Sequence, residues 1–532
     1  MSKKYYLKRG VGLEPLVNQW YAWPYLVAPH THAMIMNNLH LKIMESYIKN
    51  PKMHARAVKD PKMLGGPFLD LPGDRIDIVK ALLEKTKEEQ KQKLAFADAV
   101  KDLDQLLRSE ATGFSLEGLY AKIPDVLKGY VELVYDLNSN PSMRFIQRLL
   151  FRSPFYNEAD QSATLINVTD DDRPFVLSTP RFEELHPMHY RIPFRSEAWD
   201  RLFKMKDTPQ SLDMVQDFMD ANPAVQDQFK DLFTEEPPTH SGRDREDLGD
   251  QVRIKYFGHA VVLIETRDVS IMMDPLVSYP IPDTDVPRYT LEDLPEKIDY
   301  AILTHNHQDH IMFETLIQIR HKIGTIIVPP TNGQLQDPSV KLILEMTGFK
   351  NVVEIDDLET IDVPGGSVTG LPFFGEHGDM AIRCKSGFLI ELNGQRIMCA
   401  ADSNNISPDT YHHIRKLFGP ADYMFLGMEC QGAPLSWLYG PLLTQPLERR
   451  KDQSRRFDGS DAMKGLEMIE AMGSTHAYVY AMGQEPWCCF ISSLKYTSES
   501  KPIVESDRLV KTCQEKGLVS ERLFGRKEIL LG

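Results

Sequence analysis

Three histidines and one aspartate stand within six consecutive positions of this 532-residue chain, as His305, His307, Asp309 and His310. They follow the apolar run 300–303, which predicts a buried strand that ends in a loop. His305 and His307 are two positions apart, so their side chains project to the same side of an extended chain. Asp309 and His310 follow on a tightening turn and can reach a second point nearby. One loop can therefore supply ligands to two metal ions, because dense His/Asp clusters are typical of metal sites.

The alternative is a polar turn between a strand and a helix. In that interpretation Asp309 caps a helix that begins near Ile311, and the histidines are solvated. The turn accounts for Asp309 alone and leaves three histidines in six residues unexplained, so metal binding is favoured.

The composition predicts a soluble protein of the cytoplasm, with neither a membrane nor a nucleic acid as partner. Hydrophobic residues make up 42% of the chain, but no apolar run is long enough to span a membrane, and the start has no signal-peptide core. The formal net charge of -15 disfavours nonspecific binding to a phosphate backbone. The six cysteines form no CxxC pair, which favours buried thiols over disulfides or cysteine ligands.

Residues 1–233 predict a mainly helical domain. Apolar residues recur at helical spacing through 76–107, which indicates long helices that need a partner. Further helices are expected at 126–137, 142–151, 196–206 and 211–219, and short strands at 162–168 and 173–177. This half carries no chemical motif, so we expect it to serve in dimerisation, in docking of a partner, or in covering a site made elsewhere.

Two other features of this half are interpreted as structural. The aromatic residues between Trp20 and Tyr25 are expected in a core or a subunit contact. His30 and His32 have no carboxylate close by in the sequence, so we do not expect them to bind metal. Residues 234–249 are polar and charged, with two prolines and two glycines, and they predict a linker between domains.

Residues 250–532 predict a second domain of short strands and helices. Asn393-Gly394 is a strong hairpin signal, and Ser460 is expected to cap a helix. Strands are expected at 252–257, 260–265, 269–273, 300–303, 325–328, 352–355, 367–371, 388–392, 396–400, 423–426 and 477–481, and helices at 312–323, 340–347, 408–417 and 460–472. Two sheets with helices outside them is the simplest architecture, so the whole chain is expected to be an α+β protein.

Metal-type residues recur where two of these strands end. Glu376, His377 and Asp379 follow one strand, and Asp402 follows the second strand of the hairpin. Ligands on loops at one edge of a sheet can converge on a single site. On its own, Asp402 is also compatible with a role as a helix cap.

The motif 304–310 resembles the HxHxDH signature of the metallo-β-lactamase superfamily, and 256–259 with 273–275 is similar to the opening strands of that fold. The resemblance covers about 250–532 and implies an αββα sandwich with a dinuclear metal site. It implies that His305 and His307 bind one metal ion, that Asp309 and His310 bind the other, and that Asp402 bridges them. His259 has no metal role in this pattern and is expected to be structural or to support a ligand.

The chain departs from the superfamily pattern at two ligands. The usual third motif is a Gly-His pair, but here Gly375 is followed by Glu376, with His377 as a rival one position later. We favour Glu376, because neighbours in an extended chain point to opposite sides. The usual last histidine, after the final core strand, is missing, and His476 lies before that strand. A site with three histidines and three carboxylates favours iron over zinc, because carboxylate oxygens are hard ligands and an oxygen-rich ligand set suits iron.

Over its whole length the chain resembles the dinuclear iron β-hydroxylases of chloramphenicol biosynthesis and related nonribosomal peptide pathways. The resemblance implies two iron ions per chain with an oxo or hydroxo bridge, dioxygen as co-substrate, and an external electron donor. It implies β-hydroxylation of an aminoacyl group, L-p-aminophenylalanine, held as a thioester on the carrier domain of a nonribosomal peptide synthetase. It also implies a homodimer formed through the N-terminal domain. Glu376 is then the catalytic ligand, because a carboxylate can change its coordination as substrate binds.

Two rival functions come from other classes. One is a dizinc hydrolase of an ester, lactone or phosphodiester. The other is a binding scaffold with a residual metal site. The loop 430–439 is a candidate wall of the substrate site, and simple packing explains it equally well.

Overall fold

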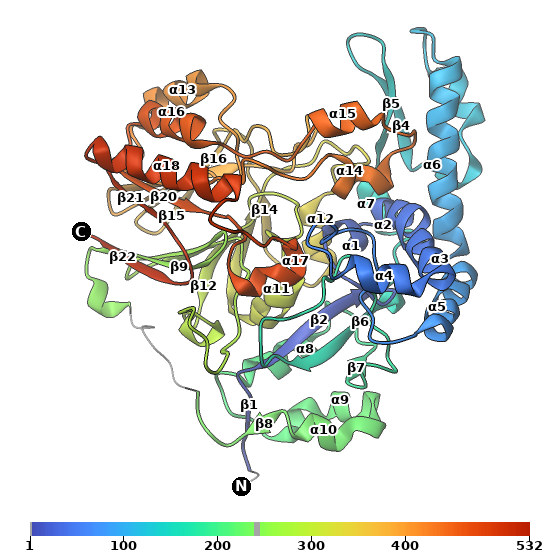
Figure 1. The fold of residues 1–532 in the computed structure, drawn as a ribbon, viewed down its shortest axis with the longest axis horizontal. Coiled ribbons are helices and arrows are strands. Elements are labelled where there is room, and N and C mark those ends of the chain that lie inside the picture. Colours follow the sequence, from blue (N-terminus) through green and yellow to red (C-terminus); the bar gives the residue numbers. More distant parts are fainter. Residues whose placement is uncertain (1–2, 239–244) are drawn as a thin grey trace.

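Two seven-stranded sheets pack face to face in the computed structural model, which describes residues 3–238 and 245–532 (Figure 1). The first sheet has the order β14 (Val352–Glu354), β13 (Ile323–Val328), β12 (Ile298–Ile302), β11 (Ser270–Met273), β10 (Val261–Glu265), β9 (Val252–Gly258) and β22 (Lys527–Leu531). The second has the order β15 (Thr360–Val363), β16 (Gly366–Leu371), β17 (Gly387–Leu392), β18 (Gln395–Cys399), β19 (Tyr423–Gly427), β20 (His476–Tyr480) and β21 (Val519–Arg522).

Helices cover the outer faces of both sheets, so strand residues of either parity are buried. On β10, Val262 and Ile264 lie in the core between the sheets, whereas Val261 and Leu263 lie in the outer apolar layer. The helices of this part of the chain are α11 (Phe313–Ile319), α12 (Val340–Met346), α13 (Pro408–Phe418), α14 (Ser436–Tyr439), α15 (Arg449–Ser454), α16 (Ala462–Met472), α17 (Cys489–Ser492) and α18 (Lys501–Glu515). This arrangement confirms the predicted αββα sandwich.

The predicted hairpin turn is confirmed, whereas the N-cap of α16 lies one residue after the predicted position. Asn393 and Gly394 join β17 to β18 with φ angles of 47° and 79°, as a tight turn with two left-handed residues requires. The N-cap of α16 is Asp461, whose side chain accepts a hydrogen bond from the Lys464 amide. The prediction of Ser460 was wrong, because the Ser460 hydroxyl accepts a hydrogen bond from the Asn405 amide instead (2.9 Å).

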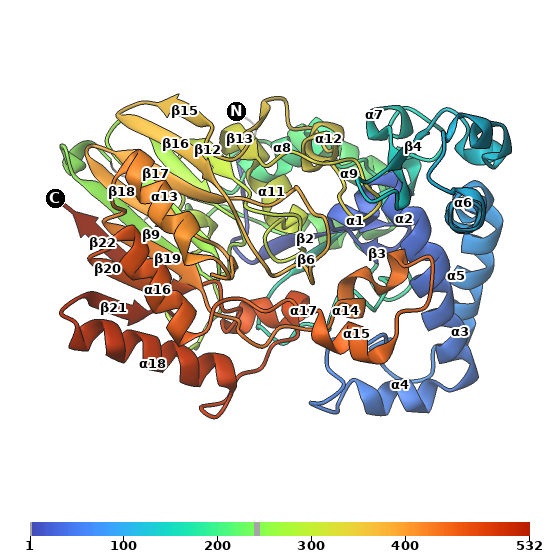
Figure 2. The same cartoon turned by 90° about the horizontal axis from the view of Figure 1, so that it is seen from above.

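The N-terminal half contains helices and also a four-stranded sheet, of which the sequence predicted only β6 (Gln161–Asn167). Its strands have the order β3 (Trp20–Tyr21), β2 (Val11–Val17), β6 (Gln161–Asn167) and β7 (His189–Tyr190). Its helices are α1 (Pro24–Val27), α2 (Pro29–Ile35), α3 (Leu41–Lys49), α4 (Pro51–Ala57), α5 (Ile76–Glu89), α6 (Lys91–Glu110), α7 (Gln147–Leu150), α8 (Glu197–Lys204), α9 (Gln216–Ala221) and α10 (Gln226–Lys230), with a π-helical turn at Met36–His40. Figures 1 and 2 show α3, α5 and α6 at the end of the molecule opposite to α18.

Three predicted elements of this half were wrong. The expected helices at 126–137 and 142–151 are largely a hairpin of β4 (Val131–Tyr135) and β5 (Pro141–Phe145), followed by the single turn of α7. Asp136 drives the reversal, because its carboxylate accepts hydrogen bonds from the backbone amides of Asn138 and Asn140 (both 2.8 Å). The expected strand at 173–177 is irregular backbone. The strand at 162–168 is confirmed as β6, and the long apolar pattern at 76–107 is two helices with a break at Gln90.

The expected burial of the aromatic residues between Trp20 and Tyr25 is confirmed. Trp20, Tyr21 and Tyr25 are buried in the core, and all six cysteines are free. His30 and His32 are buried among apolar groups, which lowers the pKa of each below its usual value, and neither belongs to a potential metal-ligand group of the described residues. Across the described ranges 3–238 and 245–532, no helix is both long and apolar enough to cross a membrane.

The two halves share one apolar core. A single buried cluster joins N-terminal residues such as Tyr25 and Phe145 to Leu303, Phe313 and Tyr439 of the C-terminal half. Of the predicted linker, Thr234 pairs with Tyr6 as part of β8 (Phe233–Thr234), which lies beside β1 (Tyr6–Leu7). Residues 239–244 lie outside the described residues, so the domain boundary at 234–249 stays a prediction.

A buried ion network also ties the halves together. The Arg173 guanidinium donates to both carboxylate oxygens of Glu314 on α11 (2.9 Å each) and to Glu14 on β2 (2.8 Å). Glu314 also accepts hydrogen bonds from the hydroxyls of Tyr21 (2.7 Å) and Tyr279 (2.9 Å). Because α11 begins three residues after His310, this network fixes the helix that follows the histidine-rich loop.

We expect Arg173→Met to lower the free energy of unfolding by about 3–5 kcal/mol, because it leaves the Glu314 carboxylate buried without a cation. Glu45→Gln is the control, since it breaks an ion pair with Lys87 whose side chains are 42% and 48% exposed. That change should cost at most about 1 kcal/mol. Urea unfolding of the full chain measures both, and equal losses would show that the Arg173 network adds no more than a surface pair.

Candidate metal centre

Three loops converge at one edge of the two sheets. The loop 303–310 leaves the end of β12, the loop 372–379 leaves β16, and 400–403 leaves β18. The ends of β16 and β18 meet because both pair with the first residues of β17. The segment before β17 is tied to the histidine-rich loop by the Ser386 amide, which donates to the carbonyl of Thr304 (2.8 Å). Loops from both sheets are therefore held against each other around the predicted ligands.

His305, His307 and Glu376 form the first potential ligand group, with one ligand atom of each within 4.8 Å of the others. Nδ1 of His307 lies 3.0 Å from Oε1 of Glu376, and Nε2 of His305 lies 3.8 Å from Oε2. His377 takes another position, because its ring stacks on that of His307 with centroids 4.4 Å apart. Glu376 has a φ angle of 60°, so the chain here is not extended. Glu376 and His377 therefore both face the site.

His305, His310 and Asp402 form the second group. Oδ2 of Asp402 lies 3.1 Å from Nε2 of His310 and 3.9 Å from Nε2 of His305. Space for this carboxylate depends on Gly427, because a Cβ at that position would lie 2.6 Å from Oδ1 of Asp402. Asp402 thus stands between the first and third groups.

The third group contains Asp309 and His310 together with His259, which the sequence placed outside the metal pattern. His259 comes from the turn between β9 and β10, and its Nε2 lies 3.5 Å from Oδ2 of Asp309. Its Nδ1 accepts a hydrogen bond from the Gly483 amide (3.1 Å), so the ring proton lies on Nε2 and points at Asp309. With this tautomer the His259 N–H faces Asp309, although Nε2 has no hydrogen-bond partner among the described residues. No local sequence signal could reveal the contact, because it joins strands far apart in the chain.

Asp274, at the end of β11, orients two of the histidines. One carboxylate oxygen accepts from the Thr304 amide (2.7 Å), and the other accepts from the Thr304 hydroxyl (2.7 Å) and from Nδ1 of His310 (2.8 Å). The Thr304 hydroxyl also lies 3.0 Å from Nδ1 of His305. With Nδ1 of both rings engaged in this way, Nε2 of each faces the centre.

The electrostatics of the site suit a cation. Burial raises the pKa of Glu376 to about 7. Burial opposes the charged form of His310, but the carboxylates of Asp402 and Asp274 outweigh it and raise the pKa of that ring. Burial and the nearby carboxylates of Asp402 and Asp309 also raise the pKa of Glu429, a residue that sequence reasoning missed.

Four buried atoms of the three potential ligand groups have no hydrogen-bond partner among the described residues. They are Nε2 of His259, Nε2 of His305, Oε2 of Glu376 and Oδ1 of Asp402. Buried polar atoms without partners are costly, and all four are of ligand type. The residues present therefore fit a metal-binding site.

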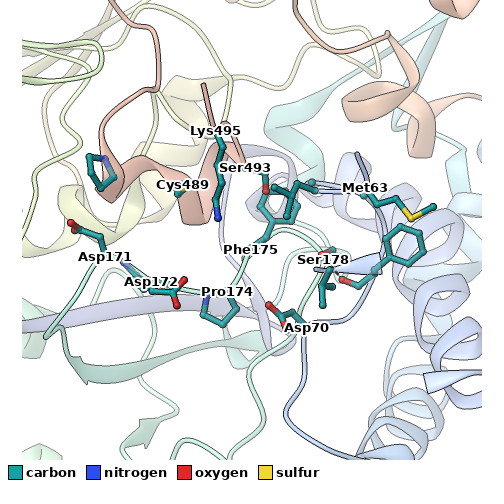
Figure 3. Close-up of a pocket in the computed structure, with 17 residues that line it drawn as sticks. Met63, Asp70, Asp171, Asp172, Pro174, Phe175, Ser178, Cys489, Ser493 and Lys495 are labelled. Atoms are coloured by element: carbon teal, nitrogen blue, oxygen red, sulfur yellow. Dashed lines mark hydrogen bonds between the residues drawn. The ribbon is translucent and has the colours of Figure 1, made fainter. Parts of the chain in front are cut away.

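Two adjoining cavities lie between the halves of the chain. One, of about 450 Å³, is lined by Asp70, Asp172 and Phe175 of the N-terminal half and by Cys489 and Lys495 of the C-terminal segment (Figure 3). The other, of about 360 Å³, is mainly apolar and is lined by residues of both halves, among them Trp23, Leu39, Trp437 and Leu438. The predicted wall 430–439 therefore contributes to a cavity, and Tyr439 at its end contacts His307 (3.3 Å).

Comparisons with known proteins cover the whole chain. A family model described as the diiron non-heme beta-hydroxylase N-terminal domain matches residues 6–237, and one described as a beta-lactamase superfamily domain matches 270–433. The 4-amino-L-phenylalanyl-[CmlP-peptidyl-carrier-protein] 3-hydroxylase of Streptomyces venezuelae is 37% identical over 532 residues, which is 99% of this chain and 100% of that protein. The crystal structure of CmlA, a diiron beta-hydroxylase from Streptomyces venezuelae, matches with a TM-score of 0.92 and 36% identity over 100% of both chains. A UPF0173 protein of Pyrococcus abyssi is 35% identical over 126 residues, which is 24% of this chain and 50% of that protein.

We expect Asp274→Asn to weaken metal binding about 10- to 100-fold, because the amide offers one oxygen acceptor where the carboxylate offers two and no longer orients His310. Asp299→Asn is the matched control, since Asp299 lies at the opposite end of β12, where it accepts hydrogen bonds from Ser270. The rate of metal loss to a chelator measures the effect. Similar rates in wild type and Asp274→Asn would show that the network does not support the centre.

Proposed function

The chain belongs to the diiron non-haem β-hydroxylases, and from this premise we propose that it hydroxylates the β-carbon of an aminoacyl group held as a thioester on the carrier domain of a nonribosomal peptide synthetase. The single observation that carries the proposal is the full-length match to a hydroxylase of a carrier-bound amino acid. That relative acts on 4-amino-L-phenylalanyl, so we propose L-p-aminophenylalanyl as the substrate here. The relatives that match over the full length do not favour the dizinc hydrolase or the binding scaffold.

The family holds two iron ions, and the ligands of this chain are proposed as follows. His305, His307 and Glu376 would hold the first iron, Asp309 and His310 would hold the second, and Asp402 would be shared by both. Support comes from the three potential ligand groups and their unpartnered buried atoms. When bound, the iron pair supplies the oxidising chemistry that inserts one atom of dioxygen into the Cβ–H bond, while two external electrons and two protons convert the other atom into water.

The chain's own residues position and protect this chemistry. Asp274 and Thr304 hold the rings of His305 and His310, and the His259 N–H faces Asp309. Glu376 is the proposed catalytic ligand, because a carboxylate can bind through one oxygen or two and so make room at the centre. The cavities between the halves are the proposed place for the aminoacyl arm. The smaller one is lined by residues of the segment 434–438, directly before Tyr439, whose hydroxyl lies 3.3 Å from His307.

The partners follow from the same proposal. The carrier domain docks on the N-terminal half, which also forms the homodimer, and an external reductant supplies the electrons. We expect the enzyme to work in the cytoplasm.

The central test compares an L-p-aminophenylalanyl carrier domain with the free amino acid. With iron, a chemical reductant and labelled dioxygen, we expect the carrier-bound group to gain one labelled oxygen at Cβ, while the free amino acid is unchanged. Mass spectrometry of the intact carrier measures this, and an anaerobic sample is the control. Oxygen-independent release of the amino acid from the thioester would overturn the proposal in favour of hydrolysis.

A second test concerns the carboxylate in the place of a histidine. Glu376→His should shift the metal preference from iron toward zinc, because imidazole suits zinc better than a harder oxygen donor does. Asp379→Asn is the control in the same loop, where Asp379 is exposed. Metal analysis after anaerobic loading from equal amounts of ferrous and zinc ions measures the ratio. An unchanged ratio in Glu376→His would argue against Glu376 as a ligand.

A further inference from the structure

The smaller cavity between the halves, of about 360 Å³, is mainly apolar and yet is lined by a buried histidine. His40 is 1% exposed, and its Nδ1 has no hydrogen-bond partner among the described residues. Three other polar side chains of the lining already donate hydrogen bonds to the protein, namely Ser178, Ser436 and Trp437. A buried imidazole without a partner is costly, so His40 is the group of this cavity that a polar ligand would satisfy.

The backbone and a neighbouring ring hold His40 in place. It is the last residue of the π-helical turn Met36–His40, in which the Leu41 amide donates to the Met36 carbonyl. Such turns are rare and occur frequently at functional sites. The imidazole also stacks on the Trp20 indole, with centroids 3.7 Å apart and an angle of 4° between the planes. The ring therefore has a fixed position although the fold does not use its Nδ1.

The lining of the cavity decides which ligand fits. Among the described residues, those that line it include no Asp, Glu, Lys or Arg. Burial lowers the pKa of His40 to about 3, so the ring is neutral at pH 7 and offers one acceptor nitrogen. An uncharged aromatic ring with an N–H or O–H group matches this lining, whereas an ammonium or phosphate group does not. The larger cavity differs, because Asp70, Asp172 and Lys495 line it (Figure 3).

The apolar cavity also lies next to the proposed metal centre. Leu438 lines it, and the hydroxyl of the next residue, Tyr439, lies 3.3 Å from Nε2 of His307. In a p-aminophenylalanyl group the uncharged aryl amine and Cβ stand at opposite ends of the ring. A substrate whose amino group binds His40 therefore presents Cβ from the other end of its ring.

We propose that His40 is a specificity residue of the hydroxylase: its ring accepts a hydrogen bond from the para-amino group of the carrier-bound p-aminophenylalanyl substrate, whose ring occupies the apolar cavity. The inference rests on the proposed function and deepens it, because it assigns a place to the aromatic end of the substrate. It also gives the N-terminal half a direct part in recognition, since His40 comes from that half.

The test compares carrier domains loaded with p-aminophenylalanyl and with p-methylphenylalanyl. The methyl group is similar in size to the amino group but cannot donate a hydrogen bond. We expect the wild type to have a kcat/KM about 10-fold lower for the methyl substrate, because that substrate leaves His40 unpaired in a buried site. His40→Phe keeps a ring against Trp20 and removes the acceptor, so the ratio should fall to about one. Affinities of the two carriers, measured anaerobically without reductant, should change in the same way.

His30→Phe is the matched control. His30 is a buried histidine of the same half, both of its nitrogens lack partners among the described residues, and it stacks on Phe145. It lines neither cavity, so His30→Phe should keep the wild-type ratio. His40→Leu is a second variant without an acceptor and should match His40→Phe, and far-UV circular dichroism checks the folding of all three variants.

Two outcomes would overturn the inference while leaving the hydroxylation intact. One is a wild type that does not prefer the amino substrate to the methyl substrate. The other is a preference that is unchanged in the folded His40 variants. A wild type that hydroxylates neither carrier-bound group would instead overturn the proposed function itself.

Discussion

The crowding of largely buried carboxylates and imidazoles is the constraint on which the rest of this structure depends. Glu376, Asp402 and Asp309 converge on three histidines, and several of these buried atoms lack a hydrogen-bond partner among the described residues. Burying ionised groups is expensive, and cations at the centre would offset that cost. The loops of both sheets, the hydrogen bonds of Asp274 and the tautomer of His259 all serve to hold these groups in place.

Ion pairs and hydrogen bonds tie the two halves of the chain together around this site. Arg173 links Glu14 of the N-terminal sheet to Glu314 on α11, directly after the histidine-rich loop. The Tyr25 hydroxyl of the N-terminal half likewise donates to the backbone carbonyl of Gln336 in the C-terminal half. The apolar core that both halves share makes these contacts rigid, because a well-packed interior leaves few alternative positions for its side chains. The N-terminal half is therefore part of the frame around the metal centre.

The fold is one that many hydrolases use, so the ligands decide the chemistry. The third loop places a carboxylate where the superfamily pattern has a histidine, and the donor facing Asp309 on the remaining side is the N–H of His259. The carboxylate of the third loop replaces a nitrogen ligand with an oxygen ligand. The N–H of His259 faces an oxygen ligand and does not add a nitrogen ligand. A harder and more adaptable ligand set suits iron, in agreement with the diiron family to which the chain belongs.

The sequence by itself determined the features that are encoded within a few residues. The spacing from His305 to His310, the Asn393-Gly394 turn and the apolar alternation of β9 to β11 predicted the metal loop, the hairpin and the layered fold. Only the tertiary structure decided what depends on contacts between distant segments. The hairpin at 131–145 looked helical because its turn is set by Asp136, and α16 begins at Asp461 because Ser460 is engaged elsewhere. His259 reaches the metal centre from 46 positions before His305, and no local pattern records such an approach.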